Sequence, residues 1–397
     1  MNFESYISYR YLTAKKGRFL AFLNFISIAG VAIGVAALIV VISVMTGFGN
    51  NLREKIIGTT PHLMIEKETG VKDFDALAQK IRDVEGVKGV SPYIQGNVFL
   101  ESEGQAMGLM ARGINPETEG QITKVTQYLK QGKLSDLTED TVIIGSELAR
   151  YFDYKLGDSI TIISLGSGIA GEGWRHKLKI VGVFKSGMTD FDMNLVLVNL
   201  KNAQHIFNLP ENVVSGLGIK IDEPYKADDM KNKIYGLFGY GFIVKTWIDI
   251  NRNLFEALFL EKWGLFIILT LMVLVASFNI ISTLVVTVSS KIHDIGILKS
   301  IGATRSSIRK IFTKQGIYIG SMGTFWGLVS GLAICYALRT YVKVPQDIYS
   351  IDHVPVDVQL FDVAAIVLAA MVISFVATIY PALKAANLQP VEALRHE

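Results

Sequence analysis

The chain is poor in cysteine and in charge. Its 397 residues include one cysteine, Cys335, and 19% charged residues against 50% hydrophobic residues. A single cysteine excludes an intrachain disulfide, so any folded domain must be held together by its own apolar core. The mean hydropathy of +0.37 is too high for an ordinary soluble enzyme of this length and predicts a membrane protein.

The sequence signatures of nucleotide and metal chemistry are also missing. The chain has no GxxxxGKS/T phosphate loop, and none of its six histidines belongs to an HExxH motif or to a close pair with metal-ligand spacing. We therefore expect no catalytic residue, no bound cofactor and no metal in this chain.

Four long runs contain no Asp, Glu, Lys, Arg or His. Each reaches the roughly 20 residues that a helix needs to cross a hydrocarbon layer of about 30 Å. Ionisable groups inside such spans are typical of ion-coupled transporters, so their absence argues against that class. The runs are residues 19–52, 263–290, 315–338 and 363–383.

The distribution of basic residues predicts the topology. Basic residues precede the first run and are frequent in 291–314, whereas the connection 343–362 is acidic. Because basic residues concentrate on the cytoplasmic side, we expect both termini and 291–314 inside, and 49–262 outside. A cleaved signal is the alternative for the first run, but its apolar part, 25–45, is longer than the roughly 7–15 residues of a signal core.

Two features near the N-terminus have open interpretations. Residues 1–18 combine aromatic and basic residues, which suits either a helix lying in the headgroup layer or the flank of a transmembrane helix. Gly30 and Gly34 form a GxxxG pattern, which lets helices approach closely and predicts a dimer seam, although the pattern is common in spans by chance.

From His62 the pattern becomes that of a mixed α+β domain. We expect strands at 62–68, 97–102, 106–114, 141–146, 194–200 and 215–221, and a hairpin formed by 159–165 and 176–184. We expect helices at 74–87, 146–154, 200–207 and 227–238.

The hairpin tip spells GxGxxG at Gly166, Gly168 and Gly171. A dinucleotide site needs a helix directly after this motif, and here a strand pattern follows instead. A protruding hairpin with exposed Ile169 and Trp174 is therefore favoured over a nucleotide site.

A short basic segment, 289–314, separates the second and third runs. Ile292, Ile295, Leu298 and Ile301 recur at spacing three, which predicts one apolar stripe of a short helix that ends at Gly302. Such a helix on a membrane face is typical of a docking surface. Upstream, 253–290 contains no helix breaker, so one continuous helix is predicted from the outer domain into the second span.

Five segments carry a family resemblance. They are ISVMTGFGNNLREKIIG (42–58), GVFKSGMTDFDMNLVLVNL (182–200), LEKWGLFIILTLMVLVASFNIISTL (260–284), DIGILKSIGAT (294–304) and YPALKAANLQPVEALRHE (380–397). The chain resembles the lipoprotein-releasing (Lol-type, LolC/LolE-like) permeases within the mechanotransmitting, MacB/FtsX-like ABC superfamily. The loop and tail are shared across the superfamily, whereas TGF, SGM and FNI favour the lipoprotein-releasing branch.

The resemblance implies a membrane protein with four transmembrane α-helices and a large α+β extracytoplasmic domain inserted between helices 1 and 2. The expected parts are a cytoplasmic amphipathic segment (1–18), helix 1 (19–48), the periplasmic domain (49–252), a stalk with helix 2 (253–290), a cytoplasmic loop with a coupling helix (291–314), helix 3 (315–342), a short periplasmic loop (343–361), helix 4 (362–383) and a cytoplasmic tail (384–397).

Three sets of site residues follow from the same resemblance. The ATPase-coupling set is Ile292, Asp294, Ile295, Leu298, Lys299, Ile301 and Gly302. The carrier-binding hook is Leu165, Gly168, Ile169, Gly171, Trp174 and Arg175, although the family's tip usually contains proline and this one is glycine-rich. The lipid or cargo cavity is Met45, Phe48, Phe255 and Phe259, with ordinary core or lipid-facing packing as the alternative for each.

The implied function is that of a non-catalytic permease in a bacterial inner membrane. Its ABC complex would extract lipoproteins from the outer leaflet and pass them to a periplasmic carrier for outer-membrane sorting. The implied partners are an ATPase subunit that binds ATP and Mg, a second permease (self or paralogue), the lipoprotein cargo, the carrier and membrane lipids, with no nucleic acid. The alternatives are a permease that regulates a periplasmic partner, and an exporter of an amphiphilic drug or peptide.

Overall fold

The computed structural model describes residues 3–13, 18–102, 104–164, 173–342 and 353–388. The chain divides into two compact units. The helical unit comprises residues 1–49, 257–343 and 353–397, and the second unit consists mainly of residues 50–256, which we call the sheet domain. The expected domain, 49–252, coincides closely with the second unit.

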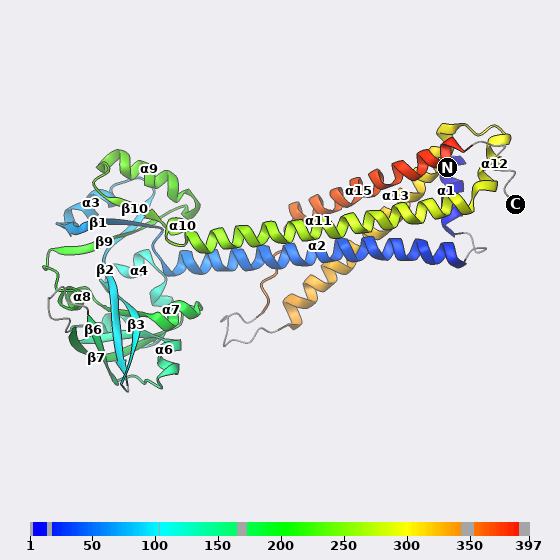
Figure 1. Cartoon of the computed structure of the whole chain (residues 1–397). Coiled ribbons are helices and arrows are strands. Elements are labelled where there is room, and N and C mark those ends of the chain that lie inside the picture. The colour runs from blue at the N-terminus through cyan, green and yellow to red at the C-terminus, as the bar shows by residue number, and fades with distance from the viewer. Residues whose placement is uncertain (1–2, 14–17, 103, 165–172, 343–352, 389–397) are drawn as a thin grey trace. The chain divides into compact units, whose positions relative to one another are not determined.

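Six helices account for most of the helical unit. Among the described residues, four of them are long and apolar enough to cross a membrane: α2, α11, α13 and α15. These four cover the four uncharged runs. The helices are α1 (Phe3–Thr13), α2 (Arg18–Thr59), α11 (Arg252–Ser290), α12 (Ile292–Ser300), α13 (Arg305–Tyr341) and α15 (Leu360–Asn387) (Figure 1).

Both long helices that flank the sheet domain in sequence extend into it. The last residues of α2, 50–59, belong to the sheet domain, and the helix stops shortly before Pro61, whose ring disfavours helical backbone in the residue before it. The first residues of α11, 252–256, also belong to the sheet domain, and α11 covers the continuous helix expected at 253–290.

Glycines on α13 allow it to pack closely on α2. At Gly323, Gly327 and Gly331, an added Cβ would lie 2.6–3.1 Å from atoms of α2. Small residues allow such backbone approach between helices in a membrane. The GxxxG glycines of α2 do not form this seam, because an added Cβ at Gly30 would lie no closer than 3.5 Å to another atom and one at Gly34 would meet nothing within 4 Å.

Gly47, the centre of the TGF motif, is covered by backbone. The segment after the third span runs past α2, where the Asp357 amide donates to the Ser43 carbonyl at 3.0 Å. An added Cβ at Gly47 would lie 2.2 Å from the Pro355 carbonyl oxygen. A glycine is therefore needed here for close approach.

We predict that Gly47→Ala lowers the stability of the helical unit by about 1–3 kcal/mol, because the 355–357 backbone must move. Thermal unfolding in detergent micelles measures this. The matched control is Gly49→Ala on the same helix, where an added Cβ meets nothing within 4 Å. Equal melting temperatures for the two variants would contradict the packing role of Gly47.

The sheet domain is built on one ten-stranded mixed sheet among its described residues, with the order β10-β1-β9-β2-β3-β8-β5-β7-β4 and β6 paired with β2 and β7. Most pairs are antiparallel, while β3 with β8 and β5 with β7 are parallel. The strands are β1 (Leu63–Lys72), β2 (Val87–Ser102), β3 (Gln105–Ile114), β4 (Leu129–Gln131), β5 (Thr141–Gly145), β6 (Ser159–Ser164), β7 (Trp174–Phe184), β8 (Leu195–Asn199), β9 (Val213–Ile221) and β10 (Ile243–Thr246).

The long strand β2 connects two lobes of this domain (Figure 1). Its first half pairs with β9, and its second half pairs with β3 and β6. One core cluster lies under β1, β9 and β10 with α3 and α9, and another lies among β3, β5, β7 and β8 with α6 and α8. The helices are α3 (Phe74–Arg82), α4 (Glu119–Ile122), α5 (Val125–Tyr128), α6 (Ser146–Tyr151), α7 (Thr189–Asn194), α8 (Leu200–Ile206), α9 (Ala227–Phe238) and α10 (Trp247–Ile250).

The expected strands and helices of this domain are present, including the β6–β7 hairpin. The sequence patterns missed the first half of β2, the short strands β4 and β10, and the short helices α4, α5, α7 and α10. The short strands and helices have too few residues to show a helical or alternating periodicity. In the first half of β2, residues 89–94 are all buried, so no alternation of apolar and polar residues is present there.

Candidate functional site: the coupling segment and the helix roots

Two residues of the predicted apolar stripe, Ile295 and Leu298, face inward from α12. Ile295 is 1% exposed and Leu298 packs beside it in a cluster with the ends of α11, α13 and α15. This cluster contains Val288, Ile308, Ile311, Phe312, Ala382 and Ala385. The stripe read from the sequence therefore fixes α12 to the helical unit.

Two predicted coupling residues, Lys299 and Asp294, form contacts with other residues of this chain. The Lys299 ammonium donates to the Ala386 carbonyl at 2.8 Å and to the Leu388 carbonyl, and so satisfies acceptors at the end of α15. Burial lowers the pKa of Lys299, helped by the nearby Arg305. Asp294 forms an ion pair with Lys291 at 2.9 Å.

The N-terminal helix α1 is part of the same assembly. Ile7 and Tyr11 pack against the cluster, and the Lys291 ammonium lies 5.3 Å from the Tyr11 ring centroid. Burial, followed by the charge of Asp294, raises the pKa of Tyr11 to about 12. Lys314 donates to the Ser5 hydroxyl at 2.7 Å, so α1 is a separate helix packed on α13.

A different face of α12 is open. Ile297 is 41% exposed and Ile301, which caps the helix, is 80% exposed. His293 is also exposed, while Ile292 is half-buried. Gly302 has φ +105°, which favours glycine and ends the helix where the sequence predicted. The open apolar face is thus Ile297 and Ile301, of which the sequence identified only Ile301.

The SGM loop, residues 186–188, holds the root of α2, residues 50–59. Buried Asp192 accepts hydrogen bonds from the Ser186 amide and hydroxyl, both at 2.8 Å, and from the Gly187 amide at 3.2 Å. The loop in turn presents the Gly187 carbonyl, which accepts from the Lys55 ammonium at 2.6 Å. The SGM loop therefore binds the end of α2 through its backbone carbonyl.

A second contact surrounds the last turn of α2. We call residues 119–128, which contain α4 and α5, the bracket. The Lys124 amide donates to the Gly58 carbonyl at 2.8 Å, and an added Cβ at Gly58 would lie 2.2 Å from the Tyr128 hydroxyl oxygen. The bracket therefore needs glycine at this position.

The root of α11, residues 252–256, is anchored by Trp247 of α10. Its ring is 1% exposed, its indole N–H donates to the Pro224 carbonyl at 2.8 Å, and Phe255 packs edge-on against it at 5.3 Å between centroids. Thr246 and Asp249 form a capping box at the start of α10. The end of β10 and the start of α11 are thus packed into the core of the sheet domain.

His62 connects the two roots. It follows closely after α2, and its carbonyl accepts from the Trp247 amide at 3.0 Å. Its Nδ1 accepts from the Ile221 amide at 3.2 Å, and burial lowers its pKa to about 4, so the ring is a neutral acceptor at pH 7.

The predicted cavity residues have different surroundings. Phe255 belongs to the core of the sheet domain, as described above. In the helical unit, Met45 and Phe48 are half-buried on α2, whereas Phe259 is 64% exposed and contacts Trp263 edge-on at 6.2 Å between centroids. Phe255 is therefore accounted for by packing, while Phe259 has an open apolar side chain.

The predicted hook lies mostly outside the described residues. Leu165, Gly168, Ile169 and Gly171 fall in the range that the structure does not describe. At the base of the hairpin, Trp174 is 47% exposed, and the Arg175 side chain forms an ion pair with Glu101 of β2 at 2.9 Å. A strand, β7, follows the GxGxxG motif, where a dinucleotide site would need a helix.

Known families match both parts of the chain. A MacB-like periplasmic core domain matches residues 24–236, and an FtsX-like permease C-terminal domain matches residues 266–390. The chain is 34% identical to the lipoprotein-releasing system transmembrane protein LolC of Neisseria meningitidis serogroup B, over 99% of each chain. The chain belongs to the lipoprotein-releasing permease family. The resemblance seen in the sequence is thereby confirmed.

The chain is also similar to other members of this permease family, which include both LolC and LolE proteins. LolC of Xylella fastidiosa is 32% identical over 98% of each chain. LolE of Haemophilus influenzae is 27% identical over 99% of each chain.

Sequence reasoning missed the permease's helix-root contacts. Lys55, Gly58 and Asp192 lie in segments that were read only as family motifs, and Trp247 lies between 238 and 253, where no element was expected. The available signal was a charged or glycine residue within an otherwise apolar or helical pattern, which often has a packing reason.

We predict that Gly58→Ala destabilises the sheet domain by about 1–3 kcal/mol, because the new Cβ overlaps the Tyr128 hydroxyl. Adding Tyr128→Phe should restore most of the loss, since the ring carbon that bears the hydroxyl lies 3.5 Å away. A double-mutant cycle by thermal unfolding measures the coupling. Strictly additive effects would show that the two residues do not share this contact.

Proposed function

We propose that this chain is a permease subunit of an ATP-driven complex that extracts lipoproteins from the outer leaflet of the inner membrane and passes them to a periplasmic carrier. The observation that carries the proposal is the match, over nearly the whole chain, to transmembrane proteins of lipoprotein-releasing systems. The sheet domain is the extracytoplasmic domain, inserted between the first and second spans, and both termini are cytoplasmic.

The energetics of the cargo explain why ATP is needed. Exposing an acyl chain to water costs about 0.8 kcal/mol per CH₂, so two or three chains cost on the order of tens of kcal/mol. An apolar space between two permeases, self or paralogue, lowers this cost. Met45, Phe48 and Phe259 are the residues of this chain that we assign to that space.

ATP hydrolysis takes place in a separate ATPase subunit that binds ATP and Mg. Its docking surface on this chain is the open face of α12, centred on Ile297 and Ile301. The inward residues Ile295, Leu298 and Lys299 transmit its movement to α11, α13 and α15 through their shared cluster. From there α11, as one continuous helix, carries the movement into the sheet domain.

The proposed function is tested by reconstitution of the permease with its ATPase and partner permease in liposomes that contain a lipoprotein. We expect ATP-dependent release of the lipoprotein to a soluble carrier. ATP hydrolysis without release would overturn the proposal. Activation of a periplasmic partner without any lipid-linked substrate would favour the regulatory alternative.

We predict that Ile297→Asp and Ile301→Asp weaken ATPase binding by at least about tenfold, because an interface centre does not tolerate an unpaired charge. Co-purification from detergent measures this. Thermal stability should stay unchanged, since both side chains are exposed.

The matched control is Leu237→Asp, which places the same charge on an exposed leucine of α9 and should leave ATPase binding intact. Leu298→Asp is not an equivalent test, because Leu298 packs in the cluster and its loss lowers stability. Normal co-purification of both the Ile297 and the Ile301 variants would exclude this face as the docking surface.

A further inference from the structure

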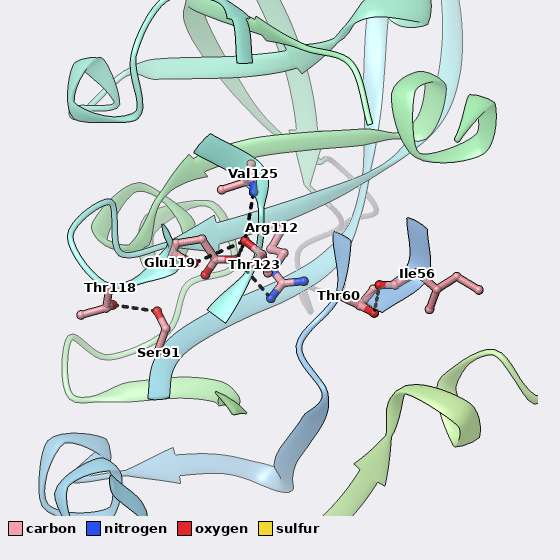
Figure 2. A network of polar contacts seen from close by, with 8 residues as sticks. All are labelled: Ile56, Thr60, Ser91, Arg112, Thr118, Glu119, Thr123 and Val125. Carbon is pink, nitrogen blue, oxygen red and sulfur yellow. Dashed lines mark hydrogen bonds and ion pairs between the residues drawn. The ribbon is translucent and has the colours of Figure 1, made fainter. Parts of the chain in front are cut away.

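The sheet domain contains a buried ion pair that the contacts above do not use. Arg112 of β3 and Glu119 of α4 are 5% and 3% exposed, and the Arg112 Nη2 and Glu119 Oε1 atoms lie 3.6 Å apart. The carboxylate also accepts from the Thr123 hydroxyl at 3.2 Å. Figure 2 shows the pair and its neighbours.

This pair is incompletely satisfied. Arg112 Nε and Nη2 and Glu119 Oε2 have no hydrogen-bond partner among the described residues. They border a cavity of about 30 Å³ that is also lined by Thr59, Tyr128 and Ser186. A cavity of this size holds one or two waters. Buried pairs of this kind seldom add to stability compared with an apolar replacement, so the pair has no evident stabilising purpose.

The position of the pair suggests a different purpose. Glu119 is the first residue of the bracket, whose Lys124 and Tyr128 hold the last turn of α2 at Gly58. Thr123, which hydrogen-bonds to Glu119, also accepts from the Val125 amide at 3.5 Å (Figure 2). The pair therefore attaches the bracket, and with it the root of α2, to strand β3.

The other side of Arg112 leads toward the root of α11. Its guanidinium carbon lies 5.1 Å from the Tyr93 ring centroid. The Tyr93 hydroxyl donates to Glu66 at 2.7 Å, and Glu66 pairs with Lys245 at 2.7 Å. Lys245 lies on β10, directly before the Thr246 cap and Trp247. Contiguous contacts thus run from the root of α2 to the root of α11.

We propose that Arg112 and Glu119 are positioning residues for lipoprotein release, which fix the bracket so that the roots of α2 and α11 move as one body with the sheet domain. The inference rests on the proposed release function. Coupling between the roots and folding of the domain are separate properties, so the test measures lipoprotein release per ATP and thermal stability independently.

The test replaces the pair by apolar residues of similar size, Arg112→Met with Glu119→Leu, in the full complex reconstituted in liposomes. We expect normal ATP hydrolysis and a melting temperature close to that of the unaltered protein, with lipoprotein release per ATP reduced by about tenfold. Hydrogen exchange at the Lys124 amide should become faster, because the bracket is no longer fixed. The Arg112→Lys variant keeps the charge and should retain part of the release.

The control pair is Lys226→Met with Glu223→Leu, which removes an exposed ion pair of 2.8 Å from the same domain. It should change neither the lipoprotein release per ATP nor the hydrogen exchange at the Lys124 amide. If the apolar double variant does not fold, Glu119→Gln, which keeps the shape of the side chain, is measured in its place. The same two quantities are measured, lipoprotein release per ATP and hydrogen exchange at the Lys124 amide. Unchanged release per ATP in a folded variant overturns the inference. A complex of unaltered protein that hydrolyses ATP without release overturns the proposed function itself.

Discussion

The close fit of the last turn of α2 into the sheet domain is the constraint on which the rest of the structure depends. Gly58 leaves no room for a side chain beneath Tyr128, and Lys55 reaches the carbonyl that the SGM loop presents. The loop is itself held by buried Asp192, so two separate segments, the SGM loop and the bracket, converge on one helical turn. The last turn of α2, attached in this way, cannot turn about the helix axis without moving the domain.

The same principle applies within the helical unit. The buried apolar side of α12 packs in a cluster that includes α1, α13 and α15, so Ile297 and Ile301 are its exposed apolar side chains. A short amphipathic helix has two faces, and the face with more apolar residues is here the inner one. The docking surface proposed for this face is small, and a small surface can be adequate because a small number of central side chains dominates most interfaces.

The sequence was sufficient for the large features and insufficient for the contacts. Four uncharged runs and the alternating strands of the sheet domain were readable because periodicity and length decide them. The end of α12 was readable because Gly302 adopts a backbone that favours glycine. The orientation of α12 could not be predicted from the sequence, because Ile295 and Ile301 belong to one stripe although Ile295 is buried and Ile301 is exposed. Lys55, Arg112 and Glu119 owe their roles to partners far away in the chain, which no local pattern can specify.

The hydrogen bonds of Lys299 have a consequence for how such proteins diverge and are recombined. This lysine on α12 donates hydrogen bonds to the carbonyls of Ala386 and Leu388. The loop between the second and third spans and the end of the fourth span therefore form a single structural module. A chimaera that exchanges only the loop between two paralogues would pair one lysine with a foreign helix end. The natural unit of exchange is therefore the loop together with the end of α15, although more than 80 residues separate them in the chain.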